Sequence, residues 1–221
     1  MQEPLTDICN VMLVDDHPVF RLGLRKLLDD QPDIHVQSET ETSQEALELL
    51  KEEAVDLLIA DLSLPEASGL DLIKKVRATY PGLPVLVISM HDENLFAERS
   101  LKAGAHGFVM KTEAPKKILE AIRKTVKSEI VLSKKQSQFI LTKALQGEAP
   151  KEQASQLGVL SDRELEVFEK LGQGKMTKEI AKMLHISVKT VETHQSHIKK
   201  KLNLSNYNEL LRAAVAWATK L

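Results

Sequence analysis

Three aspartates follow two apolar segments, and their spacing constrains the fold more than any other feature of the chain. Asp15 and Asp16 come directly after residues 8–14, and Asp61 comes directly after residues 55–60. Continuous aliphatic runs of this length predict strands buried on both faces of a parallel sheet, whose carboxyl ends meet at one edge. We therefore expect the three carboxylates to converge. Because neighbouring like charges oppose joint ionisation, the cluster predicts a bound cation, and Mg2+ is the hard divalent ion that fits best.

Up to about residue 127, short aliphatic runs alternate with amphipathic segments. We expect strands at residues 8–14, 34–39, 55–60, 85–89 and 107–110. We expect helices at residues 18–29, 43–53, 70–79, 94–103 and 115–127. This alternation predicts repeated βα units, and right-handed crossovers place their helices on both sheet faces. The predicted fold class is therefore a doubly wound α/β domain with a five-stranded parallel sheet, which binds its ligands at the carboxyl edge.

The rest of the chain is predicted to form a linker and a small all-helical domain. Residues 128–158 are rich in Lys, Gln, Ser and Ala, which indicates a partly helical linker. A helix is expected at 133–146, and residues 147–150 break it with Gly and Pro. The expected divisions of the chain are therefore 1–127, 128–158 and 159–221.

Residues 159–221 carry clear helix start signals. Ser161 and Glu164 match a capping box, and the helix that follows is expected to stop at Gly172 and Gly174. Thr177 is predicted to cap a short helix that runs to residue 183. After a tight turn at residues 185–187, further helices are expected at residues 188–202 and 207–219.

Charge is divided unevenly between the two parts. Residues 159–221 hold 11 Lys and Arg against 7 Asp and Glu, a net +4, and the remaining residues hold 19 against 25, a net −6. An acidic front and a basic rear indicate different partners, although small domains also differ in charge by chance.

Cysteine content and hydropathy favour a cytoplasmic protein without membrane contact. The single cysteine, Cys9, lies in an apolar strand pattern, so we expect a buried, inert thiol and a reducing compartment. Apolar runs stay shorter than the roughly 18 residues of a spanning helix. The first four residues lack the basic and apolar regions of a signal peptide.

Two more polar residues follow predicted strands at the same sheet edge. Ser89 ends the fourth strand and Lys111 follows the fifth. A carboxylate is a usable nucleophile toward phosphorus when a metal holds the phosphoryl oxygens, and Lys and Ser neutralise and hydrogen-bond the product. Asp61, just past the central strand, is the predicted nucleophile, whereas Asp15 and Asp16 are better placed to hold the metal.

This set of residues resembles the receiver domain of two-component response regulators. The resemblance spans residues 8–127 and rests on Asp15-Asp16-His17, on Asp61-Leu62-Ser63-Leu64-Pro65 with Gly69, and on Ser89 and Lys111-Thr112. It implies that a sensor histidine kinase phosphorylates the acceptor residue, Asp61.

The resemblance also implies roles for the residues around Asp61. Asp16, Asp61 and the backbone carbonyl of Ser63 would bind Mg2+, with Asp15 helping through water. Lys111 would contact the phosphoryl group. Ser89 and Phe108 resemble the switch pair that reorients on phosphorylation, although a lone phenylalanine is more often a core residue.

Four motifs in the rear part resemble the helix-turn-helix of LuxR-type regulators. They are residues 160–167 (LSDRELEV), 177–181 (TKEIA), 186–191 (ISVKTV) and 198–202 (IKKKL). Together with the receiver, they make the whole chain similar to the NarL/FixJ family. The resemblance implies binding to double-stranded operator DNA.

Helical periodicity supports that implication. In the helix after Ser187, the apolar residues Val188, Val191, Ile198 and Leu202 share one face, which should pack against the preceding helix. The opposite, polar face would enter the major groove, with lysines at phosphates and shorter side chains at base edges. The predicted DNA contacts are Lys178, Lys182, Lys189, Glu192, Thr193, Ser196, Lys199 and Lys200.

Several residues depart from the family pattern. By resemblance, the base-reading positions are Glu192, Thr193 and Ser196, and lysine is common at the first of them, whereas Glu192 suits a cytosine amino group. Tyr207 replaces the usual arginine at the start of the last helix. Met90 follows the switch hydroxyl, where a small residue is usual, and its bulk is expected to slow the loss of phosphate.

Two smaller features of the rear part remain open from sequence alone. His185, His194 and His197 offer a metal site that no acid or thiol completes. The apolar last helix pairs with its twin in a DNA-bound homodimer by resemblance, or else packs on its own domain. A dimer would read half-sites about ten base pairs apart or a multiple of that.

We therefore expect a transcription regulator switched by phosphorylation, without enzyme activity beyond its own modification. One alternative is a phosphorylated adaptor that does not bind DNA. The other is a phosphohydrolase with Asp61 as nucleophile, which the absence of an acid two residues later, at Ser63, argues against.

Overall fold

The computed structural model describes residues 8–65, 68–145 and 157–219. The chain folds into two compact units, Met1–Thr142 and Lys143–Leu221. The predicted helix break at residues 147–150, the first four residues and part of the predicted linker lie outside the described residues.

The first unit is built on a five-stranded parallel sheet, as the sequence predicted. Its order is β2-β1-β3-β4-β5. The strands are β1 (Cys9–Val14), β2 (Ile34–Thr40), β3 (Leu57–Ala60), β4 (Val85–Ser89) and β5 (Gly107–Met110). β1 and β3 are neighbours in register, Val14 opposite Ala60, so the loops that carry the aspartates leave the sheet side by side. The fold class is therefore confirmed.

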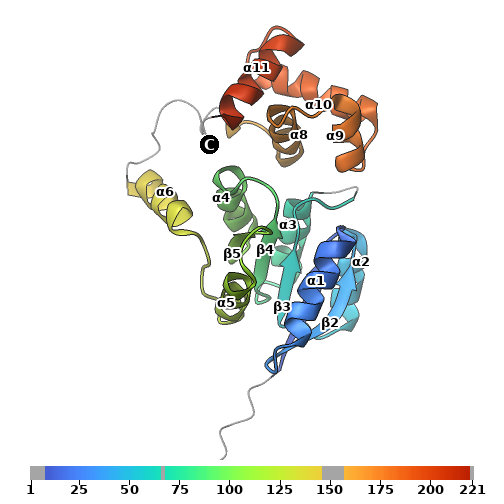
Figure 1. Cartoon of the computed structure of the whole chain (residues 1–221), viewed down its shortest axis with the longest axis vertical. Helices are drawn as coiled ribbons and strands as arrows, with labels where there is room; N and C mark the ends of the chain where they lie inside the picture. The colour runs from blue at the N-terminus through green and yellow to red at the C-terminus, as the bar shows by residue number, and fades with distance from the viewer. Residues whose placement is uncertain (1–7, 66–67, 146–156, 220–221) are drawn as a thin grey trace, which may run out of the picture. The chain divides into compact units, whose positions relative to one another are not determined.

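Helices cover both faces of this sheet (Figure 1). One layer holds α1 (Pro18–Asp29) and α5 (Pro115–Val126), and the other holds α2 (Ser43–Glu52), α3 (Gly69–Thr79) and α4 (Glu93–Ala103). Leu24 and Leu28 of α1 and Ile118 and Ile122 of α5 join one core cluster with alternate strand residues. Because strand side chains alternate between faces, the remaining strand residues line the second layer.

Local signals fix where these helices begin. Pro18 and Pro115 occupy the first turns of α1 and α5, where the missing N–H costs no hydrogen bond. Thr42 caps α2, and its hydroxyl accepts a hydrogen bond from the Glu45 N–H. Helices α1 to α5 lie within two residues of their predicted bounds.

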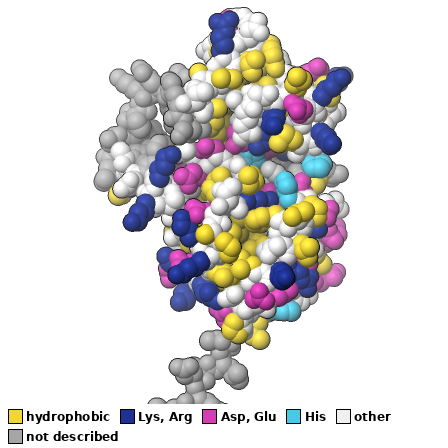
Figure 2. Space-filling model, viewed as in Figure 1, with side chains coloured by type: hydrophobic (Ala, Val, Ile, Leu, Met, Phe, Trp, Pro, Cys, Tyr) yellow, Lys and Arg dark blue, Asp and Glu magenta, His cyan; other side chains and the backbone are white. Residues whose placement is uncertain are grey.

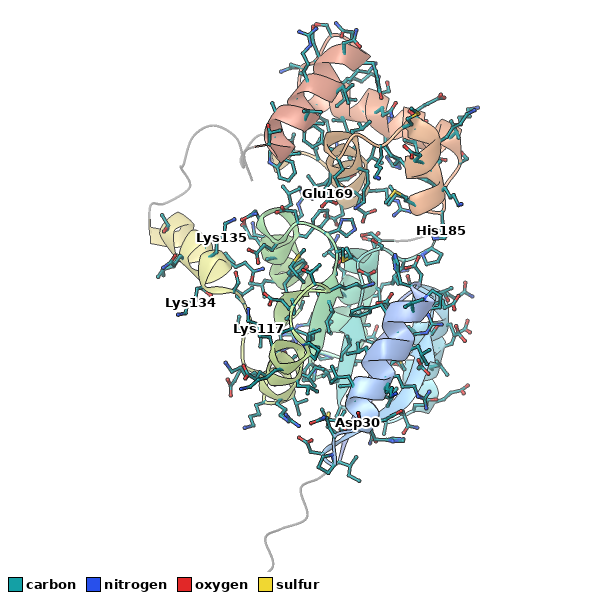
Figure 3. All side chains as sticks on the ribbon, in the orientation of Figure 1. Asp30, Lys117, Lys134, Lys135, Glu169 and His185 are labelled. Atoms are coloured by element: carbon teal, nitrogen blue, oxygen red, sulfur yellow. The ribbon has the colours of Figure 1, made fainter. Side chains whose placement is uncertain are left out.

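After α5 the chain returns to the sheet before entering α6 (Lys134–Leu145). Val131 forms a parallel bridge with Gly107, and its carbonyl accepts a hydrogen bond from the Phe108 N–H at 3.0 Å. Lys134 and Lys135 are exposed on the first turn of α6 (Figure 3). This segment covers the edge of β5 and connects the helix to the first unit.

The second unit contains four described helices. They are α8 (Asp162–Gly172), α9 (Thr177–Met183), α10 (Val188–Lys201) and α11 (Tyr207–Ala218). The capping box of Ser161 and Glu164 is present, as predicted. The prediction for α9 was wrong in one detail, because Met176 is its N-cap residue and Thr177 already lies inside the helix. The Met176 N–H donates to the Glu179 carboxylate at 2.7 Å, which is the part of a capping box that Glu179 supplies.

Gly172 is the last residue of α8, and Gly174 lies in the turn that follows. A Cβ on Gly172 would lie 2.6 Å from the carbonyl oxygen of Ala214, so this glycine lets α11 approach α8 closely. Gly174 has a φ of 76°, a left-handed conformation that other residues adopt at a cost. Among the helices described, none has the length and apolarity needed to cross a membrane.

Candidate functional site

The three predicted aspartates converge at the carboxyl edge of the sheet. Donor atoms of Asp15, Asp16, His17 and Asp61 all lie within 4.8 Å of one another. The Asp61 N–H donates to the Val14 carbonyl at 2.8 Å, which ties the end of β3 to the end of β1. Asp61 and Asp15 are only 2% and 5% exposed. The predicted convergence of the three carboxylates at this edge is thus confirmed.

Lys111 is the cation of this cluster. Its Nζ lies 2.7 Å from an oxygen of Asp15 and 2.7 Å from Oδ2 of Asp61, and it also lies over the Phe20 ring. Burial, and next the charge of Asp61, raise the pKa of Asp15 above its ordinary value, although Lys111 opposes them. One lysine against three carboxylates leaves negative charge in a buried place, which favours a further cation.

Asp61 is held in a defined orientation. Its Oδ1 accepts hydrogen bonds from the Ser89 hydroxyl at 2.7 Å and from the Leu62 N–H at 2.6 Å, while Oδ2 faces Lys111. Ser89 is fully buried at the end of β4, the neighbour of β3. Phe108, the other member of the predicted switch pair, is 2% exposed in β5.

The donor set fits Mg2+. Carboxylate oxygens are the ligands that Mg2+ prefers, and Asp15, Asp16 and Asp61 supply them within one small cluster. The carbonyl of Ser63 stays a predicted ligand. Its hydroxyl lies 3.0 Å from Nε2 of the buried His91, which fixes the loop that carries this carbonyl.

Two histidines at this site were missed as participants by the sequence analysis. His17 Nδ1 lies 2.6 Å from Asp16 Oδ1, and the ring is half-exposed at the mouth of the cluster. The His91 N–H donates to the Ser89 Oγ at 3.3 Å, and its ring contacts Phe96. His17 follows the aspartate pair directly, so adjacency was an available signal, whereas nothing in the sequence pairs His91 with Ser63.

A groove opens beside the acidic cluster, between α1 and α5. It measures about 880 Å³, and its lining includes His17, Phe20, Met90 and Lys111. Figure 2 shows hydrophobic side chains gathered on this face of the first unit. Met90 is 51% exposed and lines this groove together with Lys111.

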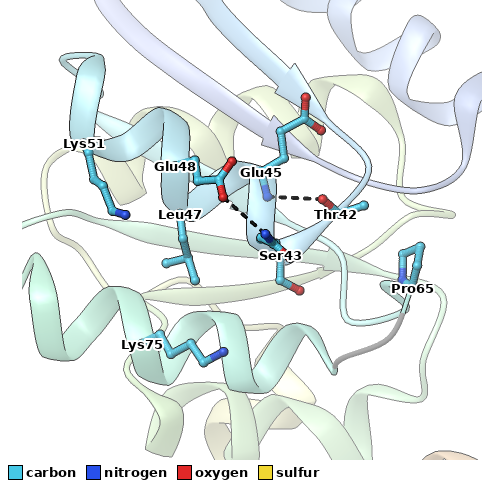
Figure 4. A pocket seen from close by; sticks show the side chains of 9 residues that line it. Thr42, Ser43, Glu45, Leu47, Glu48, Lys51, Pro65 and Lys75 are labelled. Atoms are coloured by element: carbon cyan, nitrogen blue, oxygen red, sulfur yellow. Dashed lines mark hydrogen bonds between the residues drawn. The ribbon is translucent and has the colours of Figure 1, made fainter.

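A second groove, of about 660 Å³, lies between α2 and α3 (Figure 4). Lys51 and Lys75 line it from the two helices, with Glu45 and Glu48 beside them. None of the predicted site residues lines it, so it is separate from the acidic cluster.

In the second unit, α9 and α10 form a helix-turn-helix whose turn contains His185 at a φ of 51° (Figure 3). All eight predicted DNA contacts lie on α9 or α10. Ser196 and Lys199 are partly exposed, and the others are exposed: Lys178, Lys182, Lys189, Glu192, Thr193 and Lys200.

The inner face of α10 differs from the predicted one at two positions. Val191 and Ile198 are fully buried, as expected, but Val188 is 38% exposed because it begins the helix. Gln195 is buried instead, and its Nε2 donates to the Thr177 hydroxyl of α9 at 3.2 Å. The prediction was based on apolar residues, so it missed Gln195, whose side chain is polar.

One lysine at the end of α10 is held by an ion pair within this unit. Lys201 Nζ lies 2.7 Å from the Glu164 carboxylate of α8, so of the three consecutive lysines this one is engaged within the unit. The pKa of Glu164 is lowered: burial alone would raise it, but the hydrogen bonds from Lys201 and the Ser161 backbone outweigh burial.

His185, His194 and His197 are not part of a metal site in the described ranges. The acidic cluster is the group there whose side chains could together hold a metal ion, and it includes none of these histidines.

Two family models match the chain. The response regulator receiver domain matches residues 11–123, and the luxR family of bacterial regulatory proteins matches residues 158–214. The chain is 30% identical over 206 residues to the response regulator UvrY of Escherichia coli strain K12, with 93% of each chain covered.

Solved structures of RcsB are similar over nearly the whole length. RcsB from Salmonella enterica serovar Typhimurium, bound to promoter rprA in the presence of the phosphomimetic BeF3−, has a TM-score of 0.62 and 28% identity, covering 95% of this chain and 99% of that chain. A structure of two RcsB dimers bound to two parallel DNAs has a TM-score of 0.57 and 27% identity, with the same coverage. The chain therefore belongs to the NarL/FixJ family of response regulators, with a receiver domain followed by a LuxR-type helix-turn-helix DNA-binding domain.

Proposed function

We propose that a sensor histidine kinase phosphorylates Asp61 and that this modification switches sequence-specific binding of operator DNA. The observation that carries the proposal is the arrangement around Asp61, whose two carboxylate oxygens contact Ser89 and Lys111 within a cluster of three acids. A buried carboxylate with these partners is suited to accept a phosphoryl group.

In the transfer, an oxygen of Asp61 attacks the phosphorus of a phosphohistidine. The new P–O bond forms as the P–N bond breaks, and the departing imidazole takes up a proton. Mg2+, held by Asp16, Asp61 and the Ser63 carbonyl with Asp15 beside them, would neutralise the phosphoryl oxygens. Lys111 would move its contact from the carboxylate to the phosphoryl group, and Ser89 would donate its hydroxyl proton to it.

The switch follows from the contacts that phosphorylation changes. The Ser89 hydroxyl now donates to Asp61 Oδ1, and it would follow the phosphoryl group to a new position. Phe108 lies on β5, next to β4, and would fill the space that Ser89 leaves. A complete switch from 1:99 to 99:1 needs about 5.5 kcal/mol of differential stabilisation, so a partial shift requires less.

The active form is proposed to be a homodimer on DNA. RcsB, a relative of similar length, binds DNA as dimers. Val215 of α11 is 39% exposed, whereas Leu210 and Ala214 are buried and Trp217 contacts Phe168 of α8. Leu210, Ala214 and Trp217 are therefore used within their own unit, and the exposed Val215 is available for a partner.

The first experiment is DNA binding by the full chain, with and without acetyl phosphate and Mg2+. Genomic fragments should be bound more tightly and selectively after phosphorylation, and Asp61→Asn should abolish the difference. Asp71→Asn removes an exposed acid on α3 that contacts Lys74, so it should behave like the wild type.

The other outcomes separate the alternatives. Equal binding with and without phosphate would contradict the switch. Phosphorylation without any DNA binding would favour the adaptor, and continuous release of phosphate from acetyl phosphate at a rate typical of enzymes would favour the phosphohydrolase.

A further inference from the structure

The orientation of α10 is fixed by contacts on its inner side. Val191 and Ile198 are fully buried, and Gln195 is hydrogen-bonded to Thr177 of α9. At the end of the helix, Lys201 contacts Glu164 of α8. Because these contacts reach from the second turn to the last one, the helix presents a fixed set of side chains on its outer side.

The outer side has an unusual distribution of charge. Lys189, Thr193, Ser196 and Lys200 are spaced by three or four residues, so they form one stripe along the helix. Glu192 lies beside this stripe, one turn after Lys189, and is exposed. It is the single acidic residue of α10, which contains four lysines.

The donors and acceptors on the outer side of α10 restrict which ligand groups it can bind. The Thr193 hydroxyl donates to the Lys189 carbonyl at 2.9 Å, so it offers its oxygen lone pairs and its methyl group to a ligand. A carboxylate is only an acceptor. No hydrogen bond or ion pair joins Glu192 to another residue in the described part of the chain. The middle of the surface is therefore rich in acceptors, with a lysine at either end.

An acceptor-only group has few partners on a DNA duplex. Phosphates repel the carboxylate, and the donors at base edges in the major groove are the amino groups of cytosine and adenine. Adenine presents its N7 acceptor beside that amino group, which repels a carboxylate, whereas cytosine presents the donor alone. We propose that Glu192 accepts a hydrogen bond from a cytosine amino group in each half-site and thereby specifies one base pair of each half-site; this rests on the proposed DNA binding.

The test selects bound sequences from a random duplex library, using the full chain with BeF3− and Mg2+. The wild type should enrich cytosine at one position of each half-site. Glu192→Gln has the same shape without the charge and pairs with adenine through donor and acceptor, so preference for cytosine should fall about 5- to 150-fold and adenine should rise. The same variant should bind the unselected library more tightly, because a charge that repels phosphate is gone.

Lys200→Gln is the matched control on the same stripe. It removes a positive charge, so it should weaken binding to all sequences about evenly and leave the base preferences unchanged. Trp217 fluorescence during thermal unfolding checks that each variant folds.

Two results would overturn the inference. If Glu192→Gln selects the same bases as the wild type, then Glu192 does not read cytosine, although the proposed DNA binding stands. If the wild type retains no sequence from the library with or without BeF3−, both the inference and the proposed DNA binding fall.

Discussion

At the residue scale, one lysine lies among the three acids of the receiver domain, of which Asp15 and Asp61 are buried. Lys111 contacts Asp15 and Asp61 at 2.7 Å, yet burial and the neighbouring charge still raise the pKa of Asp15. This arrangement stores electrostatic repulsion in the unmodified, metal-free protein. Binding of a cation would relieve that repulsion and so link the stability of the domain to its ligand.

Asp15→Asn should remove a pH dependence of stability. The folded domain binds the Asp15 proton more tightly than the unfolded chain does, because folding raises the pKa of this carboxyl above its ordinary value of 3.8. The free energy of unfolding therefore falls as the pH rises from about 3.8 through the raised pKa. In EDTA, hydrogen exchange of the β3 amides should slow in the variant relative to the wild type as the pH rises through this range. A difference that stays constant with pH would contradict the prediction.

Met90→Ala should accelerate loss of phosphate from Asp61 severalfold. Met90 is half-exposed and lines the groove beside Lys111, so truncation opens the approach of water. The measurement is the decay of the phosphorylated protein in Mg2+ after removal of the phosphodonor. Val19→Ala, on the same groove and 85% exposed, serves as control and should leave the decay unchanged. Equal rates for Met90→Ala and the wild type would reject this role for Met90.

At the element scale, glycines decide how closely two elements approach. Gly107 lets the segment after α5 lie against β5, since a Cβ there would lie 2.8 Å from the Cβ of Val131. Gln136 of α6 then donates to Glu93 of α4 at 2.9 Å. Through these contacts, α6 is attached both beside Phe108 and at the start of α4.

Two helical glycines should respond to alanine in opposite directions. Gly172→Ala should destabilise the second unit by about 1–3 kcal/mol, because its Cβ would meet the Ala214 carbonyl at 2.6 Å. Gly23→Ala in α1 meets nothing within 4 Å and should stabilise the first unit by about 0.5–1 kcal/mol. Trp217 fluorescence during urea unfolding reports on the second unit, and hydrogen exchange of the sheet amides reports on the first. Stabilisation by Gly172→Ala would show that α11 moves away without cost.

At the scale of the whole molecule, an acidic receiver domain and a basic DNA-binding domain occur in one chain. Residues 159–221 are net +4 and the rest are net −6. In the proposed function, each domain has its own ligand: Asp61 of the receiver domain takes a phosphoryl group, and α10 of the DNA-binding domain takes DNA. If one ligand changes the affinity for the other, thermodynamics requires the effect to be reciprocal.

Operator DNA should therefore raise the affinity for BeF3− by the factor by which BeF3− raises the affinity for DNA, about 5- to 150-fold. Titrations of BeF3− in Mg2+, with and without operator, measure the first factor, and DNA titrations measure the second. Asp61→Asn should eliminate both. Unequal factors would mean that a further equilibrium, such as dimerisation, carries part of the coupling.

The parallel sheet, nearly all helix bounds and the acidic site could be predicted from the sequence, because each depends on local patterns. Apolar runs form buried strands, and Asp15, Asp61 and Lys111 directly follow them. Tertiary structure alone decided the contacts between distant segments. These include the pairing of Ser63 with His91, the burial of Gln195 against Thr177, the close approach of α11 at Gly172, and the engagement of Lys201 by Glu164. Such contacts depend on how whole elements pack, and local periodicity carries no information about the element that lies opposite.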